Sequence, residues 1–315
     1  MSTPLKVTDR VPFESTLGTD ISHANDVTDA LRIANLDWGL IDVPNPTFPI
    51  LCDDGVINAS LPDRRLLVRD DNGVVLSTVG SRYVPLSNAD VYAIADHART
   101  LGARFDSAGE TNHGRTTFLT MTIPEASVRI GGHDPIDYKV ILSTSNDGGV
   151  AMSSVTARRR VCTNGLTIGI GVPQTWNIRH SASAEERLVE ARNTMTGAIR
   201  YAKEFTARAE QLAATPMTTN EYDAFLAELD PRPDEDRKTA LTRWENRRSS
   251  LMELWSTADT QEEGRHTRWA ALNAVAEWLD WEKPARGGAN AVAMRQLNDS
   301  GAATRQRAYR LLQPA

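Results

Sequence analysis

The pattern of apolar residues changes near residue 183, and this change constrains the fold more than any other feature of the sequence. Before it, short runs of β-forming residues alternate with turn sequences such as Asp71-Asn72-Gly73 and Asn146-Asp147-Gly148-Gly149. After it, apolar residues recur every three or four positions, as they do on one face of an α-helix. The sequence therefore predicts an α+β fold, in which an antiparallel β-meander with inserted helices precedes a long amphipathic helix and a helical C-terminal region.

Turn and capping residues set the expected boundaries of these elements. We expect strands at 64–70, 74–79, 81–86, 115–123, 128–130, 138–144 and 150–161, and early helices at 24–36 and 89–101. The long helix begins at the capping box Ser183-Ala184-Glu185-Glu186 and ends before Pro216. Further helices are expected at 221–229, 238–256, 264–281 and 290–312. We accordingly divide the chain into a core domain, residues 1–214, and a helical C-terminal region, residues 215–315.

Charge is distributed unevenly along the chain. Residues 1–150 hold 12 Lys/Arg against 20 Asp/Glu, residues 151–210 hold 9 against 5, and residues 211–315 hold 14 against 16. The segment 151–180 contains four arginines and not one acidic residue, although the whole chain has a net charge of −6. This distribution excludes a globally basic coat for nucleic acid but is compatible with a local basic groove.

The acid-free segment contains our candidate site for a polyanion. On a β-strand Arg158 and Arg160 point to one face, about 7 Å apart, and Arg159 points to the other. This spacing fits adjacent phosphates of an extended strand, and arginine suits bidentate contact with phosphate. Further candidates would supply backbone donors, cations beside a helix N-terminus and rings for base stacking: Asn164, Arg179, His180, Trp176, Arg82 and Tyr83. The alternative is that the arginines pair with acidic residues elsewhere in the fold or in a neighbouring subunit.

Sequence motifs of common enzyme classes are absent. The chain has no P-loop, no dinucleotide-binding glycine motif in the right context, no nucleophile elbow and no His-Glu-x-x-His. Two cysteines, Cys52 and Cys162, exclude a disulfide-stapled secreted scaffold and a four-cysteine zinc site. His133, Asp137 and Asp147 form the one acid and histidine group to test for metal-dependent chemistry. We expect no cofactor and no enzymatic activity.

Targeting and membrane segments are also absent from the sequence. The first residues lack an apolar stretch of signal-peptide length. No stretch approaches the roughly 20 apolar residues of a spanning helix. We therefore expect a cytoplasmic protein that makes no contact with a membrane.

Several segments together resemble a phage- and plasmid-like family defined by a domain of unknown function, number 932 in its series. The matching segments keep their order and extend over roughly residues 15–312: 36–40, 79–86, 158–166, 178–181 and 267–275. The resemblance implies a gene of a phage, prophage or plasmid, and it implies no particular reaction. The order of expected elements is also similar to that of RecT-like single-strand annealing proteins, which form rings or filaments and hold single-stranded DNA in a basic groove without ATP.

Three functions are compatible with these features, and we favour the first. It is a mobile-element protein that binds and anneals single-stranded DNA during homologous recombination, acting without ATP as a homo-oligomeric ring or filament in the host cytoplasm. The second is a structural or host-interaction protein without nucleic acid, which the five tryptophans after residue 240 and the acidic first half would suit. The third is an unrecognised metal-dependent nuclease.

Overall fold

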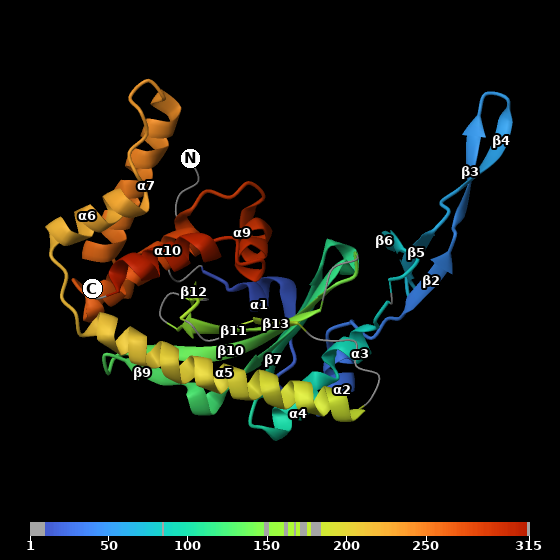
Figure 1. Ribbon diagram of the computed structural model, residues 1–315, viewed down its shortest axis with the longest axis horizontal. Helices are drawn as coiled ribbons and strands as arrows, with labels where there is room; N and C mark the ends of the chain where they lie inside the picture. Colours follow the sequence, from blue (N-terminus) through green and yellow to red (C-terminus); the bar gives the residue numbers. More distant parts are fainter. Residues whose placement is uncertain are drawn as a thin grey trace.

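The computed structural model describes residues 10–83, 85–147, 151–160, 163–166, 168–170, 175–177 and 184–313. Most strands lie before residue 178, and the long helices follow residue 183 (Figure 1). The strand pairs are antiparallel. The expected α+β class, with helices after the strand-rich part, is confirmed.

An antiparallel sheet of eight strands forms the centre of the described part. Its main path runs β1-β7-β8-β10-β11-β12, with β9 beside β10 and β13 beside β11. The strands are β1 Gly18–Asp20, β7 Arg104–Thr111, β8 Thr116–Thr122, β9 Val128–Ile130, β10 Asp134–Ser145, β11 Met152–Arg159, β12 Gly165–Leu166 and β13 Thr175–Asn177. Buried and half-buried residues alternate along β10, so side chains on both faces of the sheet are covered at least in part.

Helices cover the two faces of this sheet. On one face lies α5 (Ala184–Ala213), whose Tyr201 and Phe205 are buried with Tyr138 of β10 (Figure 1). On the other face lie α1 (Phe13–Leu17) and α9 (Gly288–Leu297), where Phe13 packs edge-on against Phe118. The remaining helices are α2 Val27–Ile33, α3 Asn88–Tyr92, α4 Ile94–Thr100, α6 Thr219–Leu229, α7 Lys238–Ser256, α8 Arg268–Glu277 and α10 Ala302–Leu312, with a π-helix at Trp278–Glu282 and 3-10 turns at Asn112–Gly114, Pro124–Ala126 and Asp259–Gly264.

Two smaller sheets extend away from the eight-stranded one. The first joins β2 Leu40–Pro44, β5 Arg64–Arg69 and β6 Val75–Gly80, and its core contains Trp38. The second is the hairpin of β3 Thr47–Cys52 and β4 Gly55–Ser60, which projects from the rest of the molecule (Figure 1). We call this hairpin the arm. The sequence predicted the β5–β6 hairpin and did not predict the arm.

Local signals placed most helices correctly. The expected helix at 238–256 is α7, and α6 begins at a capping box formed by Thr218 and Glu221. Three expectations were wrong. The helix expected at 290–312 is divided into α9 and α10 by residues 298–301. Residues 81–83 form a turn in which the Tyr83 amide donates to the Gly80 carbonyl at 2.9 Å, so the strand does not continue past Gly80. The helix expected at 89–101 is divided at Ala93 into α3 and α4.

The main hydrophobic core crosses the boundary that we set at residue 214. A single cluster of buried side chains joins β7, β8, β10 and β11 to α5, α6, α7, α8 and α10. The helical C-terminal region therefore packs directly on the sheet. Within the described part of the chain, no helix is both long enough and apolar enough to cross a membrane.

Candidate functional site

The three consecutive arginines lie at the end of β11 and alternate between the faces of the sheet. Arg158 stands opposite Asp137 of β10, and Arg159 stands opposite Ile136. Residues opposite each other in an antiparallel pair share a face, so Arg158 and Arg159 lie on different faces. The predicted alternation is confirmed.

Arg159 is buried on the α5 face of the sheet, where it joins three segments. Its Nε lies 2.5 Å from Asp134, and its Nη2 donates to the Thr260 carbonyl at 2.6 Å. The same carboxylate accepts a hydrogen bond of 2.7 Å from the indole N–H of Trp269. With 4 % of its surface exposed, Arg159 stabilises the contact between the sheet and the C-terminal helices and has no access to a ligand in solvent.

Arg158 is also buried, on the opposite face. Its Nη2 lies 2.9 Å from Glu14 of α1, and its Nη1 donates to the Thr163 carbonyl at 2.8 Å. The guanidinium carbon stands 5.3 Å from the centre of the Phe13 ring. Arg158 is 7 % exposed and Glu14 is 4 % exposed, so this ion pair is shielded from solvent.

Arg160 is the exposed member of the group, with 60 % of its side chain accessible. Its Nε and Nη2 each donate to Asp137 at 2.6 Å. Partial burial acts to raise the pKa of Asp137, but the hydrogen bonds from Arg160 and Ser127 outweigh it, and the pKa of Asp137 lies below its ordinary value. The hydrogen bonds that Arg160 donates to Asp137 in turn raise the pKa of Arg160. An exposed pair of this kind contributes little to stability and opens readily to another anion.

The expected open trough of arginines is therefore corrected. Arg158, Arg159 and Arg160 each pair with a carboxylate from an earlier part of the chain, and two of the three are buried. The physical reason is that a segment free of acids in sequence becomes surrounded by acids once its neighbouring strand and α1 are in place. The alternative that we left open, pairing within the fold, describes these contacts.

Among the other expected site residues whose side chains the structure describes, Asn164 lies beside the arginines, whereas Arg82 and Tyr83 do not. Asn164 is buried, and its carbonyl accepts the Arg159 amide at 3.2 Å. Arg82 and Tyr83 follow β6 in the smaller sheet, where Tyr83 packs against the Trp38 cluster. Burial is the main cause that raises the pKa of Tyr83, and the negative charge of Asp147 adds to it. The backbone of Trp176 lies in β13, and its side chain lies outside the described residues, as do Arg179, His180 and Cys162.

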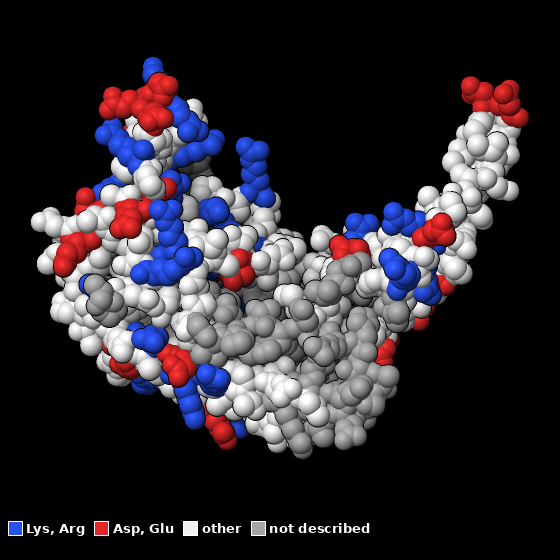
Figure 2. Space-filling model, viewed as in Figure 1, with Lys and Arg blue, Asp and Glu red and all other residues white. Residues whose placement is uncertain are grey.

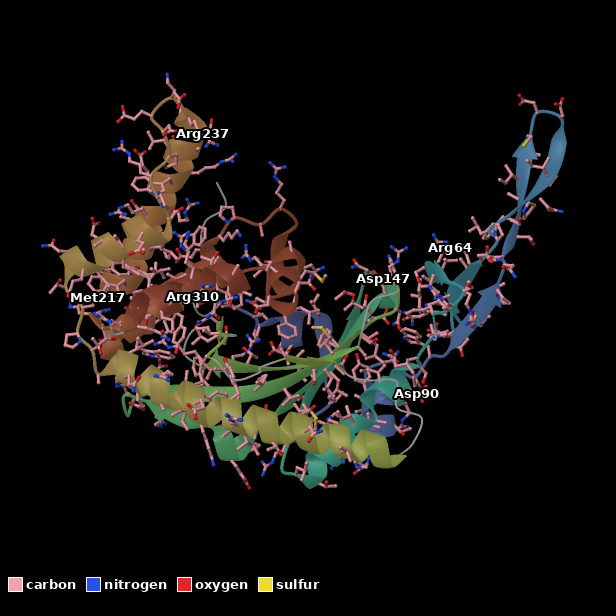
Figure 3. The ribbon with its side chains drawn as sticks, viewed as in Figure 1. Arg64, Asp90, Asp147, Met217, Arg237 and Arg310 are labelled. Carbon is pink, nitrogen blue, oxygen red and sulfur yellow. The ribbon has the colours of Figure 1, made fainter. Side chains whose placement is uncertain are left out.

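The acid and histidine group expected as a metal site is not brought together either. His133 precedes β10 and Asp147 follows it, so the 12-residue strand separates them by about 40 Å. Figure 3 shows Asp147 at the end of the sheet that faces the arm. Asp137 is bound to Arg160, as described above. Among the described residues, no three His, Cys, Asp or Glu side chains lie close enough to hold a metal ion.

The structure instead places Arg158 at the wall of a polar cavity of about 300 Å³. The cavity lies between the face of β10 and β11 that carries Arg158 and the C-terminal helices α9 and α10. Its walls consist of Ile141, Ser143, Met152, Ser154, Thr156, Arg158, Gly165, Asp280, Gln296, Leu297, Asn298, Asp299 and Arg305. We call it the Arg158 cavity. Sequence reasoning identified Arg158 and the Asn164-Gly165 turn but missed the residues from the C-terminal helices, because no local spacing connects the two halves of the wall.

The two carboxylates of the cavity wall are already occupied by partners within the chain. Asp280 forms an ion pair with Arg305 through Oδ1, and its Oδ2 accepts the Gly165 amide at 2.9 Å. Asp299 forms a second ion pair with Arg305. Burial lowers the pKa of nearby Arg295, whose guanidinium donates to the Asp280 carbonyl at 2.8 Å. These acids therefore hold the wall together and leave few acceptors for a ligand.

The donors of the wall are in excess. Arg158 Nε, Arg305 Nε and Gln296 Nε2 are buried nitrogen atoms with no hydrogen-bond acceptor among the described residues. Leaving one buried donor unsatisfied costs about 1–3 kcal/mol, so three in one cavity call for an explanation. A ligand rich in acceptors, such as a phosphate or a nucleobase carbonyl, has the complementary chemistry.

Comparison with known families shows which family the chain belongs to, but that family has no known reaction. Residues 75–307 match the family described as domain of unknown function (DUF932). The chain belongs to this family. The matched range includes strands β7 to β13 of the eight-stranded sheet, the Arg158 cavity and α5 to α9, whereas β1 and the arm lie before it. No curated protein and no solved structure matches the chain.

Proposed function

We propose that this protein binds single-stranded DNA without enzymatic activity, as a homo-oligomer that anneals strands during recombination of a phage or another mobile element, in the host cytoplasm. The observation that carries the proposal is that three residues of the wall of the Arg158 cavity, Arg158, Arg305 and Gln296, each keep a buried nitrogen donor without an acceptor among the described residues. Phosphate oxygens and base carbonyls of a nucleic acid are acceptors of the required kind. Annealing by such a protein needs no nucleotide hydrolysis.

The size of the Arg158 cavity favours a single strand over a duplex. Its volume of about 300 Å³ is at the lower end of the range for small-ligand pockets, which suits one nucleotide unit and excludes a double helix. Arg160 lies just past the end of β11, two residues after Arg158, and its side chain is 60 % exposed, so it is available for a neighbouring phosphate once it leaves Asp137. The remainder of the strand would follow the surface outside the cavity.

Filling the cavity is the direct test of this proposal. Ser154→Leu places a larger side chain in the cavity wall and removes none of the ion pairs of Arg158 or Arg305. Ser249→Leu, on the exposed side of α7, is the matched control. We expect fluorescence anisotropy with a labelled oligonucleotide at low salt to show at least about tenfold weaker binding for Ser154→Leu, equivalent to about 1.4 kcal/mol, and unchanged binding for Ser249→Leu.

Two results would remove the proposal. One is the absence of binding by the unmodified protein at low salt. The other is equal affinity of Ser154→Leu and the unmodified protein, provided that thermal melts show both to be folded. Cleavage of the oligonucleotide that depends on Mg²⁺ would contradict the non-enzymatic part and favour a nuclease. Recovery of host proteins alone, after nuclease treatment and with no oligonucleotide binding, would favour a host-interaction protein.

The salt dependence should be shallow. Because Arg158, Arg159 and Arg160 are each engaged with a carboxylate, we expect only about two or three phosphate contacts and a slope of log K against log [salt] of about −1.4 to −2.1 for a single strand. Anisotropy titrations at several salt concentrations measure this slope. A slope several times steeper would place the DNA on a broad basic surface and not at the Arg158 cavity.

A further inference from the structure

The arm exposes apolar side chains that no other element of the described chain covers. Every residue of β3 and every residue of β4 except Ala59 is exposed, and Leu51 reaches 83 %. Figure 2 shows a shaft almost free of charged residues between the end of the arm and its base. An isolated two-stranded hairpin is at best marginally stable in water, and exposed apolar patches mark sites of association.

The strand register gathers these side chains into a continuous apolar face. Phe48 stands opposite Ala59, Ile50 opposite Ile57 and Cys52 opposite Gly55. Residues that stand opposite each other share a face, so this face carries no polar side chain from one end of the hairpin to the other. The other face carries the pair Leu51 and Val56 near the tip. A hairpin with one face against the protein and one face in solvent would show alternating buried and exposed residues, and β3 and β4 show no such alternation.

The two ends of the arm carry opposite charge. Asp53 and Asp54 form the tip, and no lysine or arginine occurs between Arg32 and Arg64. Arg64 begins β5 at the base of the arm, next to the exposed Asp63 (Figure 3). Arg82 follows two residues after Gly80, which stands opposite Arg64. The side chains of Asp53, Asp54, Arg64 and Arg82 are exposed, and none forms an ion pair with another described residue.

We propose that the arm binds the arm of a second copy of this chain, with the two arms antiparallel and their apolar faces in contact. A two-fold arrangement of this kind brings the acidic tip of each arm next to Arg64 and Arg82 at the base of the other arm. The strand β4 spans about 20 Å at 3.3 Å per residue, and a turn at residues 61–63 connects it to Arg64, so complete overlap of two arms brings both pairs of unlike charges to the same ends. The acidic tip disfavours a nucleic acid or an anionic membrane as the occupant. The inference rests on the oligomeric part of the proposed function and is independent of DNA binding.

The contact between two arms buries a small area, so we expect the two copies to associate weakly. Two strands of six residues cover roughly 10 Å by 20 Å, or about 200 Å² per copy, well below the roughly 800 Å² per partner of a stable complex. We therefore expect a reversible dimer with a Kd in the micromolar range, and a dimer fraction that rises with concentration.

Sedimentation velocity over a concentration series up to about 100 µM tests the apolar contact. We expect the unmodified protein to shift from monomer toward dimer, and Ile57→Asp to remain monomeric throughout. Val189→Asp, which changes an exposed apolar residue of α5 to the same side chain, is the control and should dimerise normally. A monomer at every concentration for the unmodified protein, or undiminished dimerisation of Ile57→Asp, overturns the inference.

A charge exchange tests the antiparallel arrangement and the identity of the partner. The pair Asp53→Arg with Asp54→Arg should weaken the dimer, as should the pair Arg64→Asp with Arg82→Asp. The chain that carries all four substitutions should dimerise again, because each tip then meets an opposite charge at the base of the other copy. Failure of the fourfold variant to recover overturns the antiparallel arrangement.

The same variants separate this inference from DNA binding. Ile57→Asp leaves the Arg158 cavity unchanged, so it should still bind a short oligonucleotide as a monomer. Retained dimerisation with no DNA binding would remove the DNA-binding proposal and leave the arm contact standing. Loss of DNA binding in Ile57→Asp alone would show that the cavity functions only in the dimer.

Discussion

Arg159→Ala should lower the free energy of unfolding by about 3–5 kcal/mol, because it leaves the buried carboxylate of Asp134 without its cationic partner. The ion pair joins β10 and β11, and Trp269 and the Thr260 carbonyl tie it to the C-terminal helices. A domain is typically stable by only about 5–15 kcal/mol, so the loss is a large fraction of the total. Urea denaturation followed by circular dichroism measures it.

Arg160→Ala is the matched control, one residue further along the chain. Its side chain is 60 % exposed and its pair with Asp137 faces solvent, so we expect a cost below about 1 kcal/mol. The combined variant Arg159→Leu and Asp134→Leu should cost less than the sum of its single substitutions, because it leaves neither charge buried alone. Equal costs for Arg159→Ala and Arg160→Ala would contradict the buried ion pair.

The arginine segment shows where sequence reasoning stops. The strand alternation of Arg158 and Arg159 was predictable, since it follows from backbone geometry alone. Their partners Glu14 and Asp134 lie 144 and 25 residues away in sequence, and nothing in the spacing indicates which acid meets which arginine. Counting charges along residues 151–180 therefore identified a real cluster of arginines, but it did not show that two of them are buried. Burial depends on contacts distant in sequence, and a single sequence does not contain them.

Elements with strong local signals were predicted well. The turn at Asp71-Asn72-Gly73 connects β5 and β6, with Gly73 at φ 72°, where glycine is favoured. The helical periodicity after residue 183 corresponds to α5, and the helix expected at 221–229 corresponds to α6. In each case the deciding interaction lies within a few residues, so the sequence itself contains the information.

The arm and the Arg158 cavity were both missed, for different physical reasons. The arm has apolar residues on both faces, so it lacks the alternation by which a half-buried strand is recognised, although Asp53-Asp54-Gly55 is a plausible turn. The cavity combines β10 and β11 with Asp280, Gln296 and Arg305, which are far away in sequence. The five tryptophans after residue 240 would suit a host-interaction surface, but none of them is exposed. Trp255, Trp269 and Trp281 are buried, and Trp244 is half-buried.

Trp255→Ala is expected to cost about 3–5 kcal/mol, comparable to other large aromatic truncations in a packed core. Trp255 of α7 is 1 % exposed and stacks on Tyr222 of α6, with ring centres 4.3 Å apart and planes at 14°. Its other neighbour is His266, 5.0 Å away, in the segment before α8. The substitution therefore loosens the contact of α6 and α7 with the rest of the C-terminal region.

The form of the unfolding transition distinguishes two organisations of the chain. Because one buried cluster includes Trp255 together with the sheet residues, we expect a single transition, with far- and near-ultraviolet circular dichroism coincident and both shifted by Trp255→Ala. Trp244→Ala is the control, since Trp244 is half-buried and donates one hydrogen bond, to the Asp230 carbonyl at 2.8 Å, and it should cost only about 1 kcal/mol. If Trp255→Ala produced an early transition confined to residues 215–313 while the sheet melted unchanged, the C-terminal helices would be a separately folding unit and the continuous core would not govern stability.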